Sequence, residues 1–426
     1  MQIIDTQQNN IEEVINLIQS VRSKKEDVKS VVLPIMEQVR RDGDKALFSL
    51  TEKFDGVSLK SLRVTKEEIQ EAMDNISPKL LKSLKQAKKN IEKFHTAILC
   101  KKEPAIKIQA GVKIWREFRP IEKVGLYVPG GKAAYPSTVL MLAIPAQVAG
   151  CREVIICTPP DRKGKCNPAV LVAASICGVK KIFKVGGAQS IAAMAYGTET
   201  IPKVYKIFGP GNQYVTTAKI LAYGDVDIDM PAGPSEVLII ADKSANPAWV
   251  AADLLSQLEH GEDSQAVLLT TDQDFAKKVC QEIDIQTKKL SRKSIIAKSE
   301  QVSFIVIVKN LDEAIKISNE YAPEHLEIDI KNPNTVLPKI INAGSVFLGK
   351  YTSEPLGDYA SGTNHTLPTS GYAKMFPPLS TDSFGKMMQV QKVSKEGLRK
   401  LKETVETIAE NEGLDAHKNA ISIRFK

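Results

Sequence analysis

The stretch DLLSQLEHGEDSQ, residues 253–265, places a glutamine and a histidine three residues apart near the end of an expected helix. Residues with this spacing share one face of a helix, so the side chains of Gln257 and His260 point in the same direction. Both carry lone pairs that can bind a metal ion. The alternative is an ordinary helix end whose polar groups are satisfied by hydrogen bonds. This stretch alone leaves both interpretations open.

A second reactive pair occurs in YAPEHLEI, where Glu324 directly precedes His325. Pro323 interrupts the local helix, so we expect the pair to lie in a loop. Both side chains can accept protons near neutral pH, which suits general acid–base catalysis. The alternative is a charge pair at a helix end.

Two more histidines lie in polar segments. The stretch GDYASGTNHTLPT, residues 357–369, contains Asp358 and His365 and almost no large aliphatic side chain. A polar loop of this length is typically functional or disordered. His417 lies near the end of the chain in ENEGLDAHKNA, where a lone histidine is usually solvated.

Gln257, His260, Asp358 and His417 would together supply two imidazole nitrogens and two oxygens. That donor set suits zinc or a similar divalent ion. The spacing is not that of a short zinc motif, so composition alone does not establish the site. No cysteine lies beside these motifs, so a route through a thiohemiacetal has no evident nucleophile.

The elements that must position these residues follow a regular order. From about Val124, each apolar run is followed by glycine or proline and then by a helix, which is typical of βα units in a parallel sheet. A second series begins with SEVLIIAD, residues 235–242. We predict an α/β fold with two doubly wound, Rossmann-like parallel-sheet domains, an N-terminal helical segment and a C-terminal helical tail. The expected bounds are 1–110 for the helical segment, packed on the second α/β domain, then 111–233, 234–375 and 376–426.

The helix that carries Gln257 should begin with Asn246 as its N-cap and Pro247 at its first position. Val250, Leu254 and Leu258 mark its buried face, and Gln257 points toward the interior side. We expect Gly261 to end the helix.

Bulk composition places this 426-residue chain among ordinary globular proteins, with 43% hydrophobic and 25% charged residues. It has no apolar run long enough to cross a membrane, and its acidic, polar first residues lead us to expect no secretory signal. The net charge of +8 comes with no recognition motif, so we expect no nucleic-acid partner. The six cysteines form no CxxC pair, which favours a reduced, cytoplasmic protein.

Several longer motifs carry a resemblance to the histidinol dehydrogenase family. They run in order along essentially the whole chain: GLYVPGG, VGGAQSIAAMAYG, GPGNQYV, AGPSEVLIIAD, DLLSQLEHGEDSQ, YAPEHLEI, GDYASGTNHTLPT and LDAHKNA. The resemblance implies a zinc-containing, NAD-dependent alcohol and aldehyde dehydrogenase. Such an enzyme oxidises L-histidinol to L-histidinaldehyde and then to L-histidine, in the last steps of histidine biosynthesis.

The resemblance also implies site residues and an assembly. One zinc ion per subunit would be held by Gln257, His260, Asp358 and His417, with Glu324 and His325 as the catalytic pair. Substrate contacts would come from Ser235, Gln257, His260, His325, Asp358, Glu412 and His417, and NAD contacts from Tyr127, Gln189 and Asn212. Residues 111–233 would then bind NAD, and 234–375 would bind zinc and substrate. The family forms homodimers with exchanged C-terminal tails, which would bring His417 to a site in the partner.

The residues themselves agree with these roles. Histidinol carries an imidazole and an amino group that can complete a zinc sphere, and His325 has a suitable ordinary pKa of about 6.5 for accepting the hydroxyl proton. The GxGxxG fingerprint is absent, so NAD binding depends mainly on the resemblance. Two other classes remain open: a zinc hydrolase that uses Glu324 to activate water, and a non-catalytic binding module that uses the basic helices.

Overall fold

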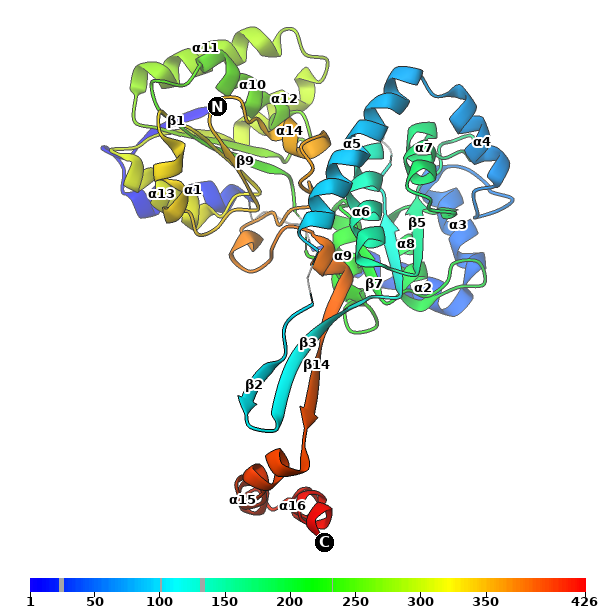
Figure 1. The fold of residues 1–426 in the computed structure, drawn as a ribbon. Helices are drawn as coiled ribbons and strands as arrows, with labels where there is room; N and C mark the ends of the chain where they lie inside the picture. The colour runs from blue at the N-terminus through cyan, green and yellow to red at the C-terminus, as the bar shows by residue number, and fades with distance from the viewer. Residues whose placement is uncertain (23–26, 100–101, 131–134, 232) are drawn as a thin grey trace.

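The computed structural model describes residues 1–22, 27–99, 102–130, 135–231 and 233–426. Cys100, Gly131 and Ala232, which belong to the cysteines and motifs named above, lie outside these ranges. The described chain forms two α/β units and a projecting arm (Figure 1). Two doubly wound parallel sheets are present, so the predicted α/β class is confirmed. Within the described residues, no helix combines the length and the apolarity that crossing a bilayer requires.

The first unit contains a five-stranded parallel sheet in the order β6-β5-β4-β7-β8. Numbered along the chain, its strands follow the order 3-2-1-4-5, as in a doubly wound nucleotide-binding sheet. Its elements are β4 (Lys123–Tyr127), α6 (Pro136–Ala149), β5 (Glu153–Thr158), α7 (Pro168–Ile176), β6 (Lys181–Lys184), α8 (Gly187–Tyr196), β7 (Lys206–Phe208), α9 (Gln213–Ala222) and β8 (Asp227–Ile228).

The second unit repeats this strand order in β11-β10-β9-β12-β13 and adds β1 (Gln2–Asp5) beside β11. Its elements are β9 (Glu236–Ala241), α10 (Pro247–Leu258), β10 (Gln265–Thr270), α11 (Gln273–Thr287), α12 (Lys293–Ser299), β11 (Phe304–Ile307), α13 (Leu311–Tyr321), β12 (His325–Asp329), β13 (Ser345–Leu348) and α14 (Glu354–Tyr359). Short 3-10 turns cover Glu300–Val302, Pro333–Thr335, Leu337–Lys339, Tyr372–Lys374 and Thr381–Phe384.

Both sheets are covered on both faces. Ile155 and Ile156, neighbours on β5, belong to different hydrophobic clusters, and Val237 and Leu238 of β9 show the same division. Successive strand residues point to opposite faces, so these clusters lie above and below each sheet. Because both faces are covered, β9 and β10 are buried at every position and appear in the sequence as continuous apolar runs. Complete burial of one Val, Ile or Leu side chain stabilises a fold by roughly 1.5–3 kcal/mol.

The N-terminal segment packs differently from the prediction. β1 pairs with β11 and α1 (Ile11–Arg22) contacts α13, so both join the second unit. The next four helices pack instead on the first unit, against α6 to α9. These are α2 (Lys29–Asp42), α3 (Asp44–Asp55), α4 (Lys66–Asn75) and α5 (Pro78–Ala97). The amphipathic pattern predicted the helices but could not identify which sheet would cover their apolar faces.

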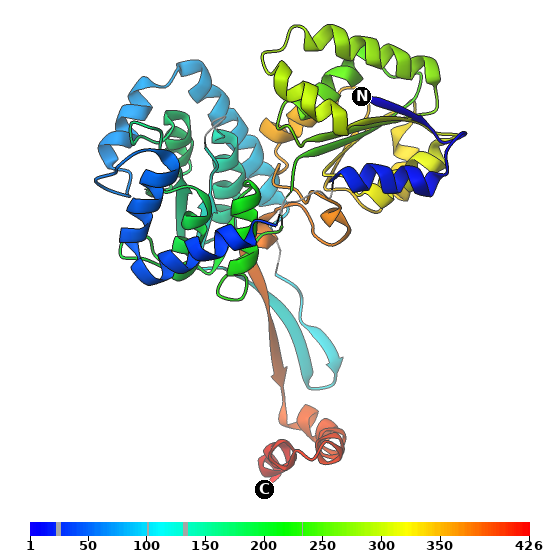
Figure 2. The same ribbon diagram turned by 180° about the vertical axis from the view of Figure 1, so that it is seen from behind.

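The arm is the second departure from the prediction, because it contains a third, antiparallel sheet. β14 (Gly385–Val393) pairs with β3 (Val112–Pro120) along its whole length, and β2 (Ile106–Gln109) completes this sheet. α15 (Lys395–Asn411), α16 (Asp415–Ser422) and a 3-10 turn (Ile423–Phe425) follow. Figures 1 and 2 show these helices at the far end of the arm, away from both α/β units. The tail is therefore helical only after a nine-residue strand.

Candidate active site and metal centre

Helix α10 positions the first pair of candidate ligands. The side chain of Asn246 accepts a hydrogen bond from the Ala248 amide at 2.9 Å, and Pro247 occupies the first position, as predicted. Val250, Leu254 and Leu258 are at most 1% exposed, and Gln257 is fully buried. The helix ends at Leu258 with Glu259 as its C-cap, so the prediction that Gly261 ends it was wrong. His260 lies in the turn beyond the helix, where the chain leaves toward β10.

A group of possible metal ligands gathers beside this turn. His260, Glu354 and Asp358 each offer one ligand atom, and these atoms lie within 4.8 Å of one another. His260 Nδ1 lies 2.9 Å from the Ser256 carbonyl oxygen. When Nδ1–H donates to that oxygen, the lone pair of Nε2 remains free for a cation.

Gln257 faces the same group. With its amide nitrogen directed at Glu354, it donates to the two carboxylate oxygens at 2.8 and 3.1 Å. This orientation turns the amide oxygen away from Glu354 and frees it to act as a ligand. The nitrogen and oxygen donors of Gln257, His260 and Asp358 fit a divalent cation such as zinc.

Glu354 was not among the predicted site residues, although its side chain is 1% exposed and belongs to the ligand group. A signal was present in the sequence, because Glu354 and Asp358 are four residues apart and share one face of α14. Burial raises the pKa of Glu354 to about 8. Glu354 was missed because it is far from His260 in the sequence and because α14 is too short to give a clear helical pattern.

His325 is the first residue of β12, so the prediction that it lies in a loop was wrong, whereas Glu324 lies in the connection directly before this strand. His325 pairs with Val237 in the sheet and is 3% exposed. Its Nδ1 lies 3.0 Å from the Glu236 carbonyl oxygen, and its Nε2 lies 3.5 Å from Asp358 Oδ1. Glu324 Oε2 accepts a hydrogen bond from the Glu236 amide at 2.9 Å. The structure therefore joins the predicted catalytic pair to one of the predicted metal ligands.

Burial and charge shift the acid–base properties of these groups in different directions. Burial raises the pKa of Glu324 to about 8, and the nearby imidazole partly opposes this effect. Burial alone would lower the pKa of His325, but the surrounding carboxylates, Glu324 first, hold it well above its usual range. Burial would likewise raise the pKa of Asp358, but its contact with the His325 imidazole, 3.5 Å away, holds the pKa below the ordinary value. Perturbed pKa values of several groups in one buried place are common at functional sites.

These residues lie at the amino edge of the second sheet. Glu236 and His325 begin β9 and β12, and His260 precedes β10. The loop after Asp358 joins this edge to the first unit, because His365 lies 3.2 Å from the Asp358 carbonyl oxygen and 3.3 Å from Thr138 Oγ1 of α6. Since α6 follows the carboxyl end of β4, the carboxyl edge of the first sheet faces the amino edge of the second.

The predicted NAD-binding residues gather at that carboxyl edge. Tyr127 ends β4, and its buried hydroxyl accepts a hydrogen bond from the Gly187 amide at the start of α8. Gln189 is 2% exposed on the same helix, and Asn212 caps α9 through bonds to two amides at 3.1 Å. Gly209 has φ +127°, and a Cβ there would collide with the Tyr127 carbonyl group, so only glycine permits this close approach of the loops.

The remaining predicted substrate contacts are divided between the second unit and the arm. Ser235 directly precedes β9, and its carbonyl oxygen accepts a hydrogen bond from the Gln265 amide at 3.1 Å. Glu412 lies in the turn after α15 and His417 lies on α16, and both are exposed on the arm. Figures 1 and 2 place these helices far from α10 and α14. A single chain therefore does not bring His417 to the other predicted ligands.

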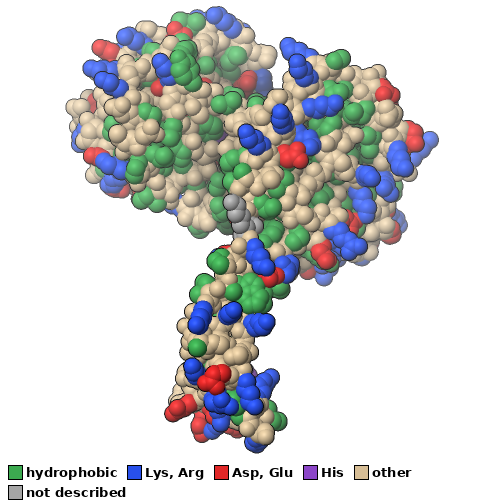
Figure 3. Space-filling model, viewed as in Figure 1, with side chains coloured by type: hydrophobic (Ala, Val, Ile, Leu, Met, Phe, Trp, Pro, Cys, Tyr) green, Lys and Arg blue, Asp and Glu red, His purple; other side chains and the backbone are tan. Residues whose placement is uncertain are grey.

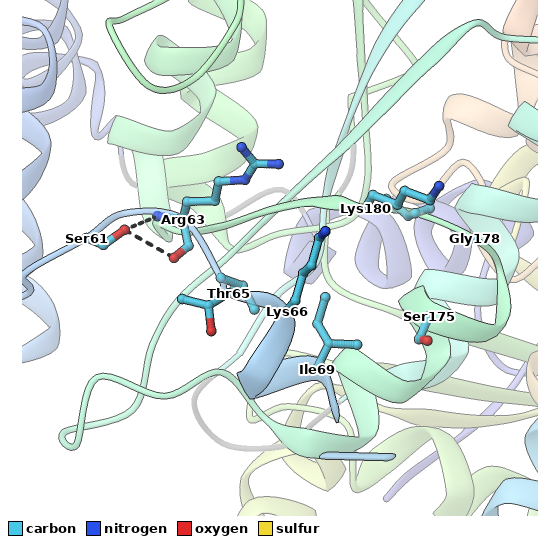
Figure 4. Close-up of a pocket in the computed structure, with 10 residues that line it drawn as sticks. Ser61, Arg63, Thr65, Lys66, Ile69, Ser175, Gly178 and Lys180 are labelled. Carbon is cyan, nitrogen blue, oxygen red and sulfur yellow. Dashed lines mark hydrogen bonds between the residues drawn. The ribbon is translucent and has the colours of Figure 1, made fainter. Parts of the chain in front are cut away.

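A separate hollow of about 600 Å³ lies at the start of α4 (Figure 4). Arg63, Lys66 and Lys180 line it together with hydroxyl and apolar side chains, and its lining contains no carboxylate, imidazole or thiol. It therefore offers neither an acid–base pair nor a metal ligand set.

The two nucleotide-binding-type sheets, with a buried acid–base pair beside a group of candidate metal ligands, indicate an α/β enzyme. The family model of histidinol dehydrogenase matches residues 18–425. The chain belongs to the histidinol dehydrogenase family. It is 53% identical over 403 residues to the histidinol dehydrogenase of Bacteroides thetaiotaomicron, with 94% of each chain covered. It is 50% identical to that of Methanosarcina barkeri, with 94% of this chain and 92% of that one covered.

A solved structure agrees with this assignment. The crystal structure of histidinol dehydrogenase from Elizabethkingia anophelis superposes with a TM-score of 0.96 at 49% sequence identity. The match covers 100% of this chain and 98% of that one, so the arm and both α/β units are common to the two proteins. The resemblance inferred from the motifs is confirmed, and so is the oxidoreductase class.

Proposed function

We propose that this protein carries out two successive NAD-dependent oxidations of L-histidinol, first to L-histidinaldehyde and then to L-histidine. Family membership supports the substrate and the pathway. The observation that carries the chemistry is the buried Glu324–His325 pair, 3.5 Å from a carboxylate of the cation-ligand group. Such a pair can move protons in both oxidations.

Gln257, His260 and Asp358 are the proposed zinc ligands within one chain. A bound zinc ion would supply a Lewis-acidic centre that holds the imidazole and amino nitrogens of the substrate. Ser235 lies at the same sheet edge and is proposed to contact the substrate. Hydrogen bonds from Gln257 to Glu354 and from His260 to Ser256 orient the ligand atoms before any cation binds.

His325 is the proposed base of the first oxidation. Its Nδ1–H donates to the Glu236 carbonyl oxygen, and among the described residues its buried Nε2 has no hydrogen-bond partner. In the neutral form of the imidazole, Nε2 would accept the hydroxyl proton of histidinol, and bound NAD would supply the acceptor for the carbinol hydride. In the second oxidation, an ionised Glu324 would accept a proton from the water that adds to the aldehyde carbon. A second bound NAD would supply the acceptor for the hydride that leaves the hydrated carbon.

The proposed NAD site is the carboxyl edge of the first sheet. Tyr127, Gln189 and Asn212 lie there, at the end of β4 and the starts of α8 and α9. Ligands of doubly wound sheets bind at this edge, where helix amino termini can face a pyrophosphate. Because this edge faces the Glu324–His325 pair, a nicotinamide ring could reach the substrate.

A homodimer with exchanged arms is proposed to complete each site. His417 and Glu412 lie on the arm, and the arm exposes large apolar side chains (Figure 3). Among them, Ile106, Ile108, Ile408 and Ile423 are each more than half exposed. Apolar surface of this kind marks an interface, and two-fold symmetry would carry each arm to the partner's site. We propose a cytoplasmic location, because the described cysteines are all free.

Spectrophotometric detection of NADH from L-histidinol tests the proposal. Turnover should require a divalent metal, stop after exhaustive chelation and return with zinc. Zinc-loaded, folded protein that forms no NADH from histidinol or histidinaldehyde would contradict the proposed activity. Hydrolytic activity in the same sample would favour a zinc hydrolase.

A further inference from the structure

A buried ion pair lies directly behind the proposed catalytic residues. Arg22, the last residue of α1, donates to both carboxylate oxygens of Glu236, the first residue of β9. The side chains are 6% and 1% exposed, and the Arg22 guanidinium stacks 3.8 Å from the centre of the Tyr321 ring. A bidentate pair of this kind is geometrically specific, because both donors must meet both acceptors.

The backbone of Glu236 contacts both members of the catalytic pair. Its amide donates to Glu324 Oε2 at 2.9 Å, and its carbonyl oxygen lies 3.0 Å from His325 Nδ1. The side chain of Glu236 is therefore held by Arg22, while its backbone orients Glu324 and fixes the tautomer of His325. One residue links the ion pair to the reacting groups through direct contacts.

The same pair holds two unusual backbone positions. Ala322 and Ser370 are the non-glycine residues with positive φ in the described chain, at +51° and +55°. Arg22 donates to the Ala322 carbonyl oxygen at 3.4 Å, and Glu236 accepts from the Ser370 amide at 2.9 Å. A non-glycine residue in this region is strained, and the strain persists only where the surrounding structure imposes it. Ala322 lies two residues before Glu324, and Ser370 lies in the segment that follows His365.

We propose that the Arg22–Glu236 pair positions Glu324 and His325 for catalysis and fastens the segment around Ser370 to the same strand end. Neither Arg22 nor Glu236 needs to touch the substrate through its side chain. Their effect is exerted through the Glu236 backbone and through Ala322. The inference rests on the acid–base roles proposed above for Glu324 and His325.

The test compares purified, zinc-loaded variants by kcat, KM for histidinol, zinc content and melting temperature. Arg22→Met should lower kcat by about tenfold to a hundredfold, since a displacement of about 1 Å at a reacting group can cost that much. KM and zinc content should stay within about twofold, because the ligand residues do not depend on this pair. Arg22→Lys keeps the charge but loses the two-pronged contact, so its kcat should lie between those of Arg22→Met and the wild type.

Lys316→Met is the matched control. It removes an exposed ion pair between Lys316 of α13 and Glu12 of α1, which does not contact the site. Its kcat should be that of the wild type. Arg22→Met leaves a buried carboxylate without its partner and can therefore prevent folding. In that case the double variant Arg22→Met/Glu236→Gln removes both charges and should show the same selective loss of kcat.

Two results would overturn the inference: a folded Arg22 variant with kcat within about twofold of the wild type, or a loss of kcat that only follows lost zinc or lost folded protein. His325→Ala, measured in parallel, separates the two proposals. An active His325→Ala variant would refute the acid–base roles. An inactive His325→Ala variant beside fully active Arg22 variants would refute only the positioning role.

Discussion

Arm exchange predicts that two inactive variants can restore each other's activity. His325 is buried in the second α/β unit and His417 is exposed on the arm, so they belong to parts of the chain that exchange would separate. In a hybrid dimer of His325→Ala and His417→Ala chains, exchange places both mutations in one site and leaves the other site intact. Without exchange, each site of the hybrid carries one mutation and both are inactive.

The expected recovery follows from counting. Random pairing makes half of the dimers hybrid, and one of two sites is intact in each, so activity should reach about a quarter of the wild-type value. The parents should be co-expressed with different affinity tags, or unfolded and refolded together, and NADH production measured per total protein. A mixture of His260→Ala with His325→Ala is the control. Both residues lie in the same unit, so every hybrid site keeps one mutation and no activity should return.

Verified hybrid dimers of the first mixture that show no more activity than this control would refute the exchange. His417 would then serve its own chain's site, and a large movement of the arm would be required.

Three further predictions concern single residues. Glu354→Gln should weaken zinc binding by about tenfold to a hundredfold, because Gln257 loses the carboxylate that orients its amide. Competition with a chelating dye measures the zinc affinity, and an unchanged affinity would exclude the orienting role of Glu354. His325→Ala should slow histidinol oxidation, and Glu324→Gln should slow oxidation of supplied histidinaldehyde more than the first step, each by about a hundredfold to ten-thousandfold. Equal, small effects of both variants on both steps would refute the roles assigned to the two residues. Burial lowers the pKa of His95 to about 4, so the unfolded chain takes up this proton below about pH 6.5 while the folded one does not. The free energy of unfolding should therefore fall by about 3 kcal/mol in total as pH drops from about 6.5 to 4. In urea titrations, His95→Leu should remove that part of the decline, and an unchanged pH dependence in this variant would contradict the prediction.

Much of the local structure was predictable because its causes lie within a few residues. Asn246 and Pro247 define the start of α10 through one hydrogen bond and one fixed torsion, and the spacing of Val250, Leu254 and Leu258 defines its buried face. The apolar runs of β9 and β10 follow from a sheet covered on both faces. The spacing of Gln257 and His260 predicted a shared helix face, but His260 lies in the turn beyond the helix. The longer motifs identified the family.

The fold alone decided which distant segments meet. The run QIID at the N-terminus has no strong strand pattern, yet β1 pairs with Phe304–Ile307, and β14 pairs with β3 across more than half of the chain. Strand pairing between remote segments depends on the loops and layers that bring them together, which no local pattern encodes.

The same reason governs the site. Type and spacing marked Glu324, His325 and Asp358 as candidates. The four-residue spacing of Glu354 and Asp358 became informative only when the fold placed His260 beside them. Nothing in the sequence near Arg22 signals that it pairs with Glu236 behind them. The sequence by itself determined the reactive groups, the helices and the family. The tertiary structure determined which of these groups lie together in one buried site. Segments from distant parts of the chain exclude water from that site, and the energy of each charge there depends on how completely they do so.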